Sequence, residues 1–259
     1  MNFEFFHLQI DNSVCLVTFD RPPANALSGA VYREIISLTK HLDDNQEIRC
    51  VVFAGASRCK AWNAGADIND FVGLDYEARI ERYKLVNDAN DRFYNLTKPV
   101  VAAIGSHAIG AGMTFAAICD IRVAAQDIYF SMPEIDRGTT SNGGAAFNRL
   151  NFPVGKMREL LFTGRHFKTE ELADTGFFNY IVPKDQVLKK SLEIATNIAK
   201  KSIHALQATK ISANAIEVMG KAEGREFAQD YTARLTSSAD GQEGILAFLQ
   251  KRITTYRRE

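Results

Sequence analysis

Small residues in the middle of the chain could place backbone amides against a reacting group. The apolar run Val100–Ile104 leads to the turn Gly110-Ala111-Gly112. Side chains this small let a ligand approach the backbone closely, and exposed N–H groups at such a turn can hold an oxyanion. The turn is not a dinucleotide fingerprint, because Phe115 stands where a third glycine is needed. It is therefore either a candidate oxyanion site or simply a tight turn.

Three further segments add to this turn, and their order along the chain is informative. Upstream lie Asp20-Arg21-Pro22-Pro23-Ala24-Asn25-Ala26-Leu27 and Trp62-Asn63-Ala64-Gly65-Ala66-Asp67, and downstream lies Phe130-Ser131-Met132-Pro133-Glu134. From about residue 8 to the C-terminus, these motifs resemble those of the crotonase superfamily, the enoyl-CoA hydratases and isomerases. The resemblance implies an enzyme that stabilises the enolate of an acyl-CoA thioester.

The resemblance also assigns chemical roles. It implies that the backbone N–H groups of Ala64 and Ala111 form the oxyanion hole for the thioester carbonyl, and that Glu134 is the catalytic carboxylate. Many hydratases of the family carry a second glutamate two residues after the last glycine of the turn, where this chain has Thr114. A hydroxyl keeps its proton at neutral pH, so Thr114 can hydrogen-bond a substrate hydroxyl or a water but cannot act as a base. The simpler interpretation of Thr114 is a filler in a short helix.

Other residues are expected to contact the substrate. By resemblance these are Ala24, Gly65, Ala66, Asp67, Ile68, Gly110 and Lys251, of which the lysine matches one that contacts coenzyme A, often from a neighbouring subunit. Asn142 lies in the polar segment 136–144, which either lines a pocket for an acyl group with polar substituents or caps a helix starting near Gly143. No cofactor is expected beyond the coenzyme A of the substrate. No metal site is expected, because the five histidines lack ligand spacing.

Composition bounds the possible partners and the compartment. The 259 residues can bury a substantial core, and 31 basic residues balance 31 acidic ones. A net charge of zero gives no footprint for nucleic acid or an anionic membrane. No apolar run approaches the roughly 20 residues of a membrane span, and the N-terminus lacks the basic region of a signal peptide. The four cysteines show no CxxC spacing and are expected to be buried free thiols of a cytoplasmic protein.

Short apolar runs alternate with amphipathic segments over the first half of the chain, which indicates an α/β fold. The predicted strands are 8–10 and 14–19, which form a hairpin, and 48–54, 100–104, 121–125 and 180–182. The predicted helices are one capped by Ser28, 76–96, a short one from near Gly112, 185–201, 203–219, 222–237 and 240–256, the last with a capping box of Asp240 and Glu243. The resemblance implies a crotonase-like ββα spiral core over residues 1–190. It also implies a C-terminal helical region over 191–259 that builds a homotrimer or a hexamer, as a dimer of trimers.

Three functions stay open at this point. One-carboxylate chemistry, above all double-bond isomerisation, is favoured because family isomerases act with one glutamate at the position of Glu134. The alternative is hydration, or lyase or hydrolase chemistry on a polar acyl-CoA, since lyases of the family also depart from the two-glutamate pattern. The third is a binding protein that kept the thioester cradle without turnover, and zero net charge disfavours its RNA-binding variant.

Overall fold

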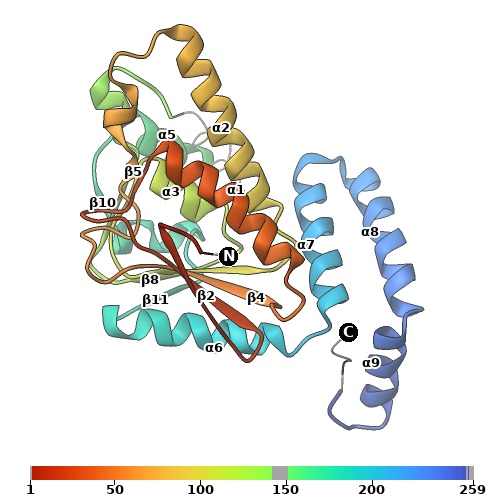
Figure 1. Ribbon diagram of the computed structural model, residues 1–259. Coiled ribbons are helices and arrows are strands. Elements are labelled where there is room, and N and C mark those ends of the chain that lie inside the picture. The colour runs from red at the N-terminus through yellow and green to blue at the C-terminus, as the bar shows by residue number, and fades with distance from the viewer. Residues whose placement is uncertain (1, 142–150, 255, 257–259) are drawn as a thin grey trace.

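The largest sheet of the structure is assembled from the apolar runs that the sequence predicts as strands. The computed structural model describes residues 2–141, 151–254 and 256 (Figure 1). In spatial order the six strands are β1 (Phe6–Asp11), β2 (Val14–Phe19), β4 (Cys50–Gly55), β6 (Val100–Ile104), β8 (Ile121–Ala125) and β11 (Tyr180–Val182). The pair β1–β2 is the predicted antiparallel hairpin, and every other neighbouring pair in this sheet is parallel. Parallel strands are covered on both faces, which explains their nearly continuous apolar sequences.

Helices cover both faces of this sheet. Helices α1 (Gly29–Asp44), α2 (Tyr76–Tyr94) and α3 (Ala111–Ala117) lie on one side, and α6 (Val187–Ala199) packs against β2, β4, β6 and β8 from the other (Figure 1). The predicted cap of α1 is confirmed, because the Ser28 hydroxyl oxygen accepts a hydrogen bond from the N–H of Val31 at 3.4 Å. The apolar side chains of Val31, Ile35, Leu38 and Leu42 follow one face of α1 and are buried.

Two small sheets hold the motif segments close together. Strand β3 (Ala26–Leu27) pairs in parallel with β5 (Gly65–Ala66), and β9 (Tyr129–Ser131) lies between β7 (Ala108–Ile109) and β10 (Phe167–Lys168). The described residues also form four 3₁₀-helices, which are η1 (Ile68–Phe71), η2 (Pro133–Arg137), η3 (Thr169–Thr175) and η4 (Lys184–Gln186). Because η1 follows β5, η2 follows β9 and α3 follows β7, segments far apart in the sequence converge in one place.

An aromatic cluster lies under these segments and fixes them to the core. The ring of Phe53 on β4 lies 5.6 Å from that of Trp62 and 5.0 Å from that of Phe115, between centroids. Phe93 on α2 closes the cluster at 4.4 Å from Phe115. All four side chains are buried. Burial of aromatic side chains contributes a large part of core stability, so the loop after Trp62 and the helix that carries Phe115 are held against the same rigid base.

The last helices leave the sheet and project to one side. They are α7 (Ile203–Val218), α8 (Lys221–Thr236) and α9 (Ala239–Leu249), and Figure 1 shows them as an extension beside the core. Buried Lys210 attaches α7 to the core, because its Nζ donates to Oδ2 of Asp120 at 2.8 Å and to the carbonyl of Lys98 at 3.2 Å. The predicted boundary between residues 190 and 191 falls inside α6, which itself packs on the sheet.

The end of the chain differs from the prediction. Helix α9 ends at Leu249, well before the predicted end at residue 256. Its cap is Ser238, whose hydroxyl oxygen accepts a backbone N–H of the first turn at 3.1 Å, and the predicted capping box of Asp240 and Glu243 is wrong. The carboxylate of Glu243 instead contacts Arg252 at 2.6 Å. This ion pair gives the chain after the helix an alternative to further helical turns.

The described residues include one helix that no sequence feature above predicted, α5 (Val154–Thr163). It begins after Pro153 and ends at Gly164, whose φ of 60° lies in the left-handed region. A proline at the start and a left-handed glycine at the end are the usual helix boundaries, so this signal was present. The helix predicted to start near Gly143 falls outside the described residues.

The structure also describes the cysteines, the length and composition of the helices, and the side chains that could bind a metal. The four cysteines are buried and unpaired, as predicted. Within the described ranges, no helix is long and apolar enough to cross a membrane. Over the same residues, no group of three or more His, Cys, Asp or Glu side chains is arranged to hold a metal ion.

Candidate active site

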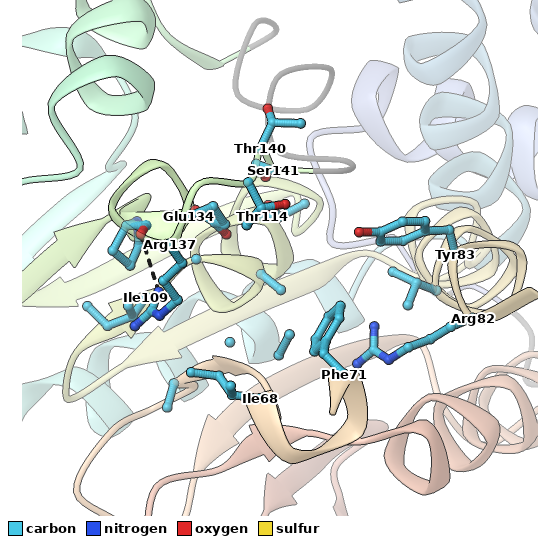
Figure 2. Close-up of a pocket in the computed structure, with 18 of the residues that line it drawn as sticks. Ile68, Phe71, Arg82, Tyr83, Ile109, Thr114, Glu134, Arg137, Thr140 and Ser141 are labelled. Carbon is cyan, nitrogen blue, oxygen red and sulfur yellow. Dashed lines mark hydrogen bonds between the residues drawn. The ribbon is translucent and has the colours of Figure 1, made fainter. Parts of the chain in front are cut away.

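A cavity of about 600 Å³ opens where the motif segments converge. Its walls come from β5 and η1, from one face of α2, from the turn that opens α3, and from η2 with the residues after it (Figure 2). Most of the predicted site residues line it, namely Ala64, Gly65, Ala66, Ile68, Gly110, Ala111, Thr114 and Glu134. The sequence therefore identified the cavity before the structure placed it.

The cavity exists because two backbone segments approach each other very closely. A Cβ added at Gly65, whose φ is 83°, would lie 2.4 Å from the carbonyl oxygen of Ile109 and 3.1 Å from the amide nitrogen of Ala111. A Cβ added at Gly112 would lie 2.2 Å from the carbonyl oxygen of Asn63. Real Cβ atoms do not tolerate such distances, so only glycine permits this approach at either position.

Asn63 is fully buried and ties the two segments together. Its carbonyl accepts the N–H of Ile109 at 3.0 Å, its own N–H donates to the carbonyl of His107 at 3.3 Å, and its Oδ1 accepts the N–H of Gly65 at 2.9 Å. The bonds to Ile109 and His107 join the two segments, and the bond to Gly65 fixes the turn within its own segment. The amide groups that face the cavity are thus fixed before any ligand binds.

The predicted oxyanion-hole donor Ala64 is wrong in one respect. Its N–H donates to the carbonyl of Ala24 at 3.2 Å, although a free N–H was expected. The N–H of Gly65 donates to Oδ1 of Asn63, so the next residue that could supply the donor is Ala66, which lines the cavity. Asp67 donates its N–H to the carbonyl of Leu27 at 3.0 Å, and backbone groups alternate along a strand, so the N–H of Ala66 points away from β3. Ala64 and Ala66 flank Gly65 in the same sequence motif, so the motif alone did not separate them.

The other predicted donor, Ala111, lines the cavity, and its role stays a prediction. It is the first residue of α3, where an N–H has no partner within its own helix, and the preceding Gly110 gives no side-chain cap. Gly110 itself has a φ of 54° and donates its N–H to the carbonyl of Ser131 at 2.7 Å. Ala111 is therefore presented to the cavity by a turn that a glycine makes possible.

Glu134 lies directly over this turn. A Cβ added at Gly110 would lie 2.7 Å from its Oε1, so the glycine also makes room for the carboxylate. Its Oε2 is buried and has no hydrogen-bond partner among the described residues. Burial raises the pKa of Glu134 above its usual value, against smaller opposing effects of a backbone N–H and of Arg137. A carboxyl group held in this way is suited to exchange a proton with a ligand.

Thr114 is one turn into α3 and faces the same space. Its side chain is buried, and its Oγ1 has no hydrogen-bond partner among the described residues. Figure 2 shows Thr114 beside Glu134 in the cavity. A buried hydroxyl without a partner is unfavourable in the folded protein, so a ligand or a water that hydrogen-bonds to it is the expected complement.

Three predicted residues of the described part of the chain do not line the cavity. Asp67 pairs with Arg21 at 2.7 Å and accepts the N–H of Asn69, so it fixes the loop rather than lining the cavity. Ala24 contributes the carbonyl that engages Ala64. Lys251 follows α9 in the helical extension beside the core, so its role toward a neighbouring subunit stays a prediction. Asn142 lies outside the described residues.

Comparisons with known proteins identify the family of the chain. Residues 9–259 match the family model described as enoyl-CoA hydratase/isomerase. The chain belongs to the enoyl-CoA hydratase/isomerase family. A probable enoyl-CoA hydratase of Rhizobium meliloti is 31% identical, over 99% of both chains. The 2,3-dehydroadipyl-CoA hydratase of Escherichia coli is 30% identical, over 94% of this chain and 95% of the relative.

Solved structures give the same result for the fold. The crystal structure of an enoyl-CoA hydratase from a Polaromonas species superimposes with a TM-score of 0.91 at 26% identity, over 97% of this chain and 99% of the other. The crotonase-like fold of this enoyl-CoA hydratase/isomerase family member is therefore confirmed. The position where the resemblance led us to look for a second glutamate holds the buried side chain of Thr114.

Several lining residues were not recognised in the sequence. One face of α2 contributes Arg79, Arg82, Tyr83, Val86 and Asn90 to the cavity wall. Their spacing is the helical i, i+3, i+4, i+7 pattern of one helix face. Polar side chains on a cavity-facing stripe were thus the missed signal.

The close approach at Gly65 leads to a direct prediction. Gly65→Ala should lose roughly 1–3 kcal/mol of unfolding free energy beyond the strain of a left-handed alanine, because its Cβ would collide with the Ile109 carbonyl. The matched control is Gly73→Ala, which has a similar φ of 74° and nothing within 4 Å of the added Cβ. Gly73→Ala should lose only about 1–2 kcal/mol of unfolding free energy. Equal losses in urea unfolding of the two variants would contradict the proposed crowding.

The burial of Glu134 predicts a pH-dependent cost. Burial raises the pKa of Glu134 in the folded state. The protein is therefore most stable, as far as this group is concerned, below the usual pKa of glutamate, and its free energy of unfolding falls as the pH rises through the raised value. Glu134→Gln should therefore raise the free energy of unfolding at about pH 8 but not at about pH 4, by about 1.4 kcal/mol per unit of pKa difference. Thermal unfolding at the two pH values measures this change. Exposed Glu159 is the control, since hydrogen bonds from Lys156 and then Arg165 lower its pKa. Glu159→Gln should show no gain at pH 8, and an equal gain in both variants would refute the account.

Proposed function

We propose that this chain isomerises the double bond of an enoyl-CoA thioester with Glu134 as its single catalytic carboxylate. One observation carries the proposal: of the described residues that line the cavity, only Glu134 has a carboxylate. Its raised pKa and unpartnered Oε2 support a role in moving a proton. Thr114 cannot supply a second acid or base, because its hydroxyl does not ionise near neutral pH.

In the proposed reaction the thioester carbonyl oxygen lies between the N–H groups of Ala66 and Ala111. The Glu134 carboxylate takes the proton from the α-carbon of a β,γ-unsaturated thioester, and the electron pair moves to the carbonyl oxygen. The two amides stabilise the resulting dienolate, and a donor of this kind contributes roughly 3–4 kcal/mol in comparable sites. Glu134 then returns its proton to the γ-carbon, the carbonyl reforms and the double bond moves to the α,β position. No other reactant is consumed.

Hydration is the second candidate, and two observations favour it. The relatives described above are named hydratases. The unpartnered Thr114 Oγ1 beside Glu134 offers a hydrogen bond that would hold a water. In that reaction Glu134 would take a proton from the water that attacks the β-carbon and would then deliver one to the α-carbon.

The two reactions differ in the fate of a label. In the isomerisation, a deuteron on the α-carbon of a β,γ-enoyl thioester should appear in part on the γ-carbon of the product in ordinary water, because one carboxylate moves it. Mass and NMR analysis of the product measures this transfer. A hydroxyacyl product from an α,β-enoyl thioester, at rates above the isomerisation, would instead establish hydration.

Variants test the roles of the two side chains. Glu134→Gln should lower kcat by roughly 10²–10⁴ with ligand binding largely kept, because it removes the base and preserves the shape. Thr114→Val removes only the hydroxyl, so isomerisation should change little, whereas hydration should lose on the order of 1–3 kcal/mol of transition-state stabilisation. Turnover of Glu134→Gln near that of the wild type would overturn the mechanism.

The proposal includes an assembly of identical chains. The end of α9 and the residues after it present an apolar surface, with Phe248 83%, Leu249 70% and Ile253 90% exposed. Apolar surface of this kind marks an interaction site, and zero net charge does not oppose self-association. A homotrimer or a hexamer would cover it and would bring Lys251 near a neighbouring chain.

At micromolar concentration, light scattering should therefore give a mass three or six times the 28.8 kDa of the single chain. Phe248→Asp with Leu249→Asp should shift the mass toward the single chain, because charges would be buried in the interface. Phe162→Asp is a matched control on α5, with a similarly exposed ring (71%) away from α9. A wild-type mass of 28.8 kDa would refute the assembly.

A further inference from the structure

One wall of the cavity contains a buried arginine that the proposed reaction does not use. Arg82 projects from α2, its side chain is 9% exposed, and its guanidinium lies 4.1 Å from the centroid of the Phe71 ring. Figure 2 shows Arg82 and Phe71 together, apart from Glu134 and Thr114. A charge taken this far out of water is unfavourable unless hydrogen bonds or an opposite charge compensate for it.

The hydrogen bonds of this guanidinium are incomplete. Its Nε and Nη2 are buried and have no acceptor among the described residues. The nearest carboxylate, Oδ2 of Asp70, lies 3.6 Å from Nη2, which is too far for a hydrogen bond, and it already accepts the N–H of Gly29 at 2.7 Å. Nε and Nη2 form one edge of the guanidinium plane. That edge matches the two oxygens of a carboxylate.

The local charge also favours an anion. Arg79 lines the cavity one turn before Arg82 and lies 5.8 Å from the same Phe71 ring, and its nitrogens donate to the carbonyls of Leu74 and Phe71. Asp70 is the one carboxylate paired with these two cations among the described residues, so one positive charge is left over. In a partly enclosed cavity this excess attracts a negative group more strongly than it would in water.

We propose that Arg82 binds a carboxylate at the far end of the acyl chain, so that the substrate is the coenzyme A thioester of an unsaturated dicarboxylic acid. The inference rests on the proposed function in one respect, which is that the thioester end lies between Ala66, Ala111 and Glu134. The acyl chain then runs along the cavity from Glu134 toward α2. Phe71 packs on the guanidinium and keeps its Nε–Nη2 edge directed at the chain end, while Asp70 limits the excess charge without using either donor.

The experiment compares three thioesters of equal chain length and nearly equal shape, which end in a carboxylate, a carboxamide or an isopropyl group. For the wild type, kcat/KM should be about 10- to 100-fold higher for the carboxylate than for the carboxamide, and the isopropyl compound should be poorest. Arg82→Met should remove this preference and leave the isopropyl compound within a few-fold of the wild type. Arg82→Lys should keep part of it, because it keeps the charge and loses the two-nitrogen edge.

Two further variants protect this test against a folding defect. Asp70→Asn removes the competing charge and can keep the hydrogen bond to Gly29, so the carboxylate preference should rise, a gain that a damaged fold cannot produce. Arg92→Met is the matched control, since Arg92 lies on the same helix, exposed and paired with Asp88. For Arg92→Met, the ratios of kcat/KM among the three thioesters should equal those of the wild type.

The outcomes separate this inference from the proposed function. Turnover with equal rates on carboxylate and carboxamide, or a preference that survives in Arg82→Met, would overturn the carboxylate site and leave the isomerase proposal intact. If no thioester turns over, calorimetric binding of the three saturated analogues replaces kcat/KM. An Arg82-dependent preference for the carboxylate would then support the binding site while the proposed reaction fails, and its absence would overturn both.

Discussion

The site depends on the close contact between the backbone segments 63–66 and 109–112. The carbonyl of Asn63 lies where a side chain at Gly112 would begin, and the carbonyl of Ile109 lies where one at Gly65 would begin. This contact brings Ala66 and Ala111 to the wall of one cavity. Neither segment forms a long strand or helix, so glycine geometry, the hydrogen bonds of Asn63 and the aromatic base under them hold the arrangement.

Four buried polar atoms on the cavity walls have no protein partner among the described residues. Thr114 Oγ1, Glu134 Oε2 and two nitrogens of Arg82 are of this kind in the described part of the chain. Most buried polar atoms in folded proteins are satisfied, so a cluster of exceptions indicates a surface built for a ligand. The surrounding core is continuous and apolar, and its stability offsets the cost of leaving these groups unpaired. The same burial that makes Glu134 unfavourable as an anion makes it a better proton carrier.

Much of the fold could be predicted from the sequence, because strands buried on both faces and amphipathic helices have strong periodic signals. Strands β6 and β8 occupy the predicted residues, and Ser28 caps α1 as expected. The site was found through its glycines and small residues. The choice between Ala64 and Ala66 was not accessible, because it depends on which N–H the neighbouring strand β3 uses. Arg82 was missed for a related reason: an arginine on a charged helix is ordinarily solvated, and only the position of η1 buries it.

The two ends of the cavity are built from different kinds of atoms. At the proposed thioester end the donors are backbone amides, and a substitution at Ala66 or Ala111 changes crowding but not the presence of an N–H. At the far end the lining residues are side chains of α2 and η1, such as Arg82 and Phe71, which a single substitution can replace. A fold of this design can keep the stabilisation of an enolate while the acyl group that it accepts changes. In the proposed mechanism the backbone therefore stabilises the enolate, Glu134 moves the proton, and one face of α2 selects the acyl group.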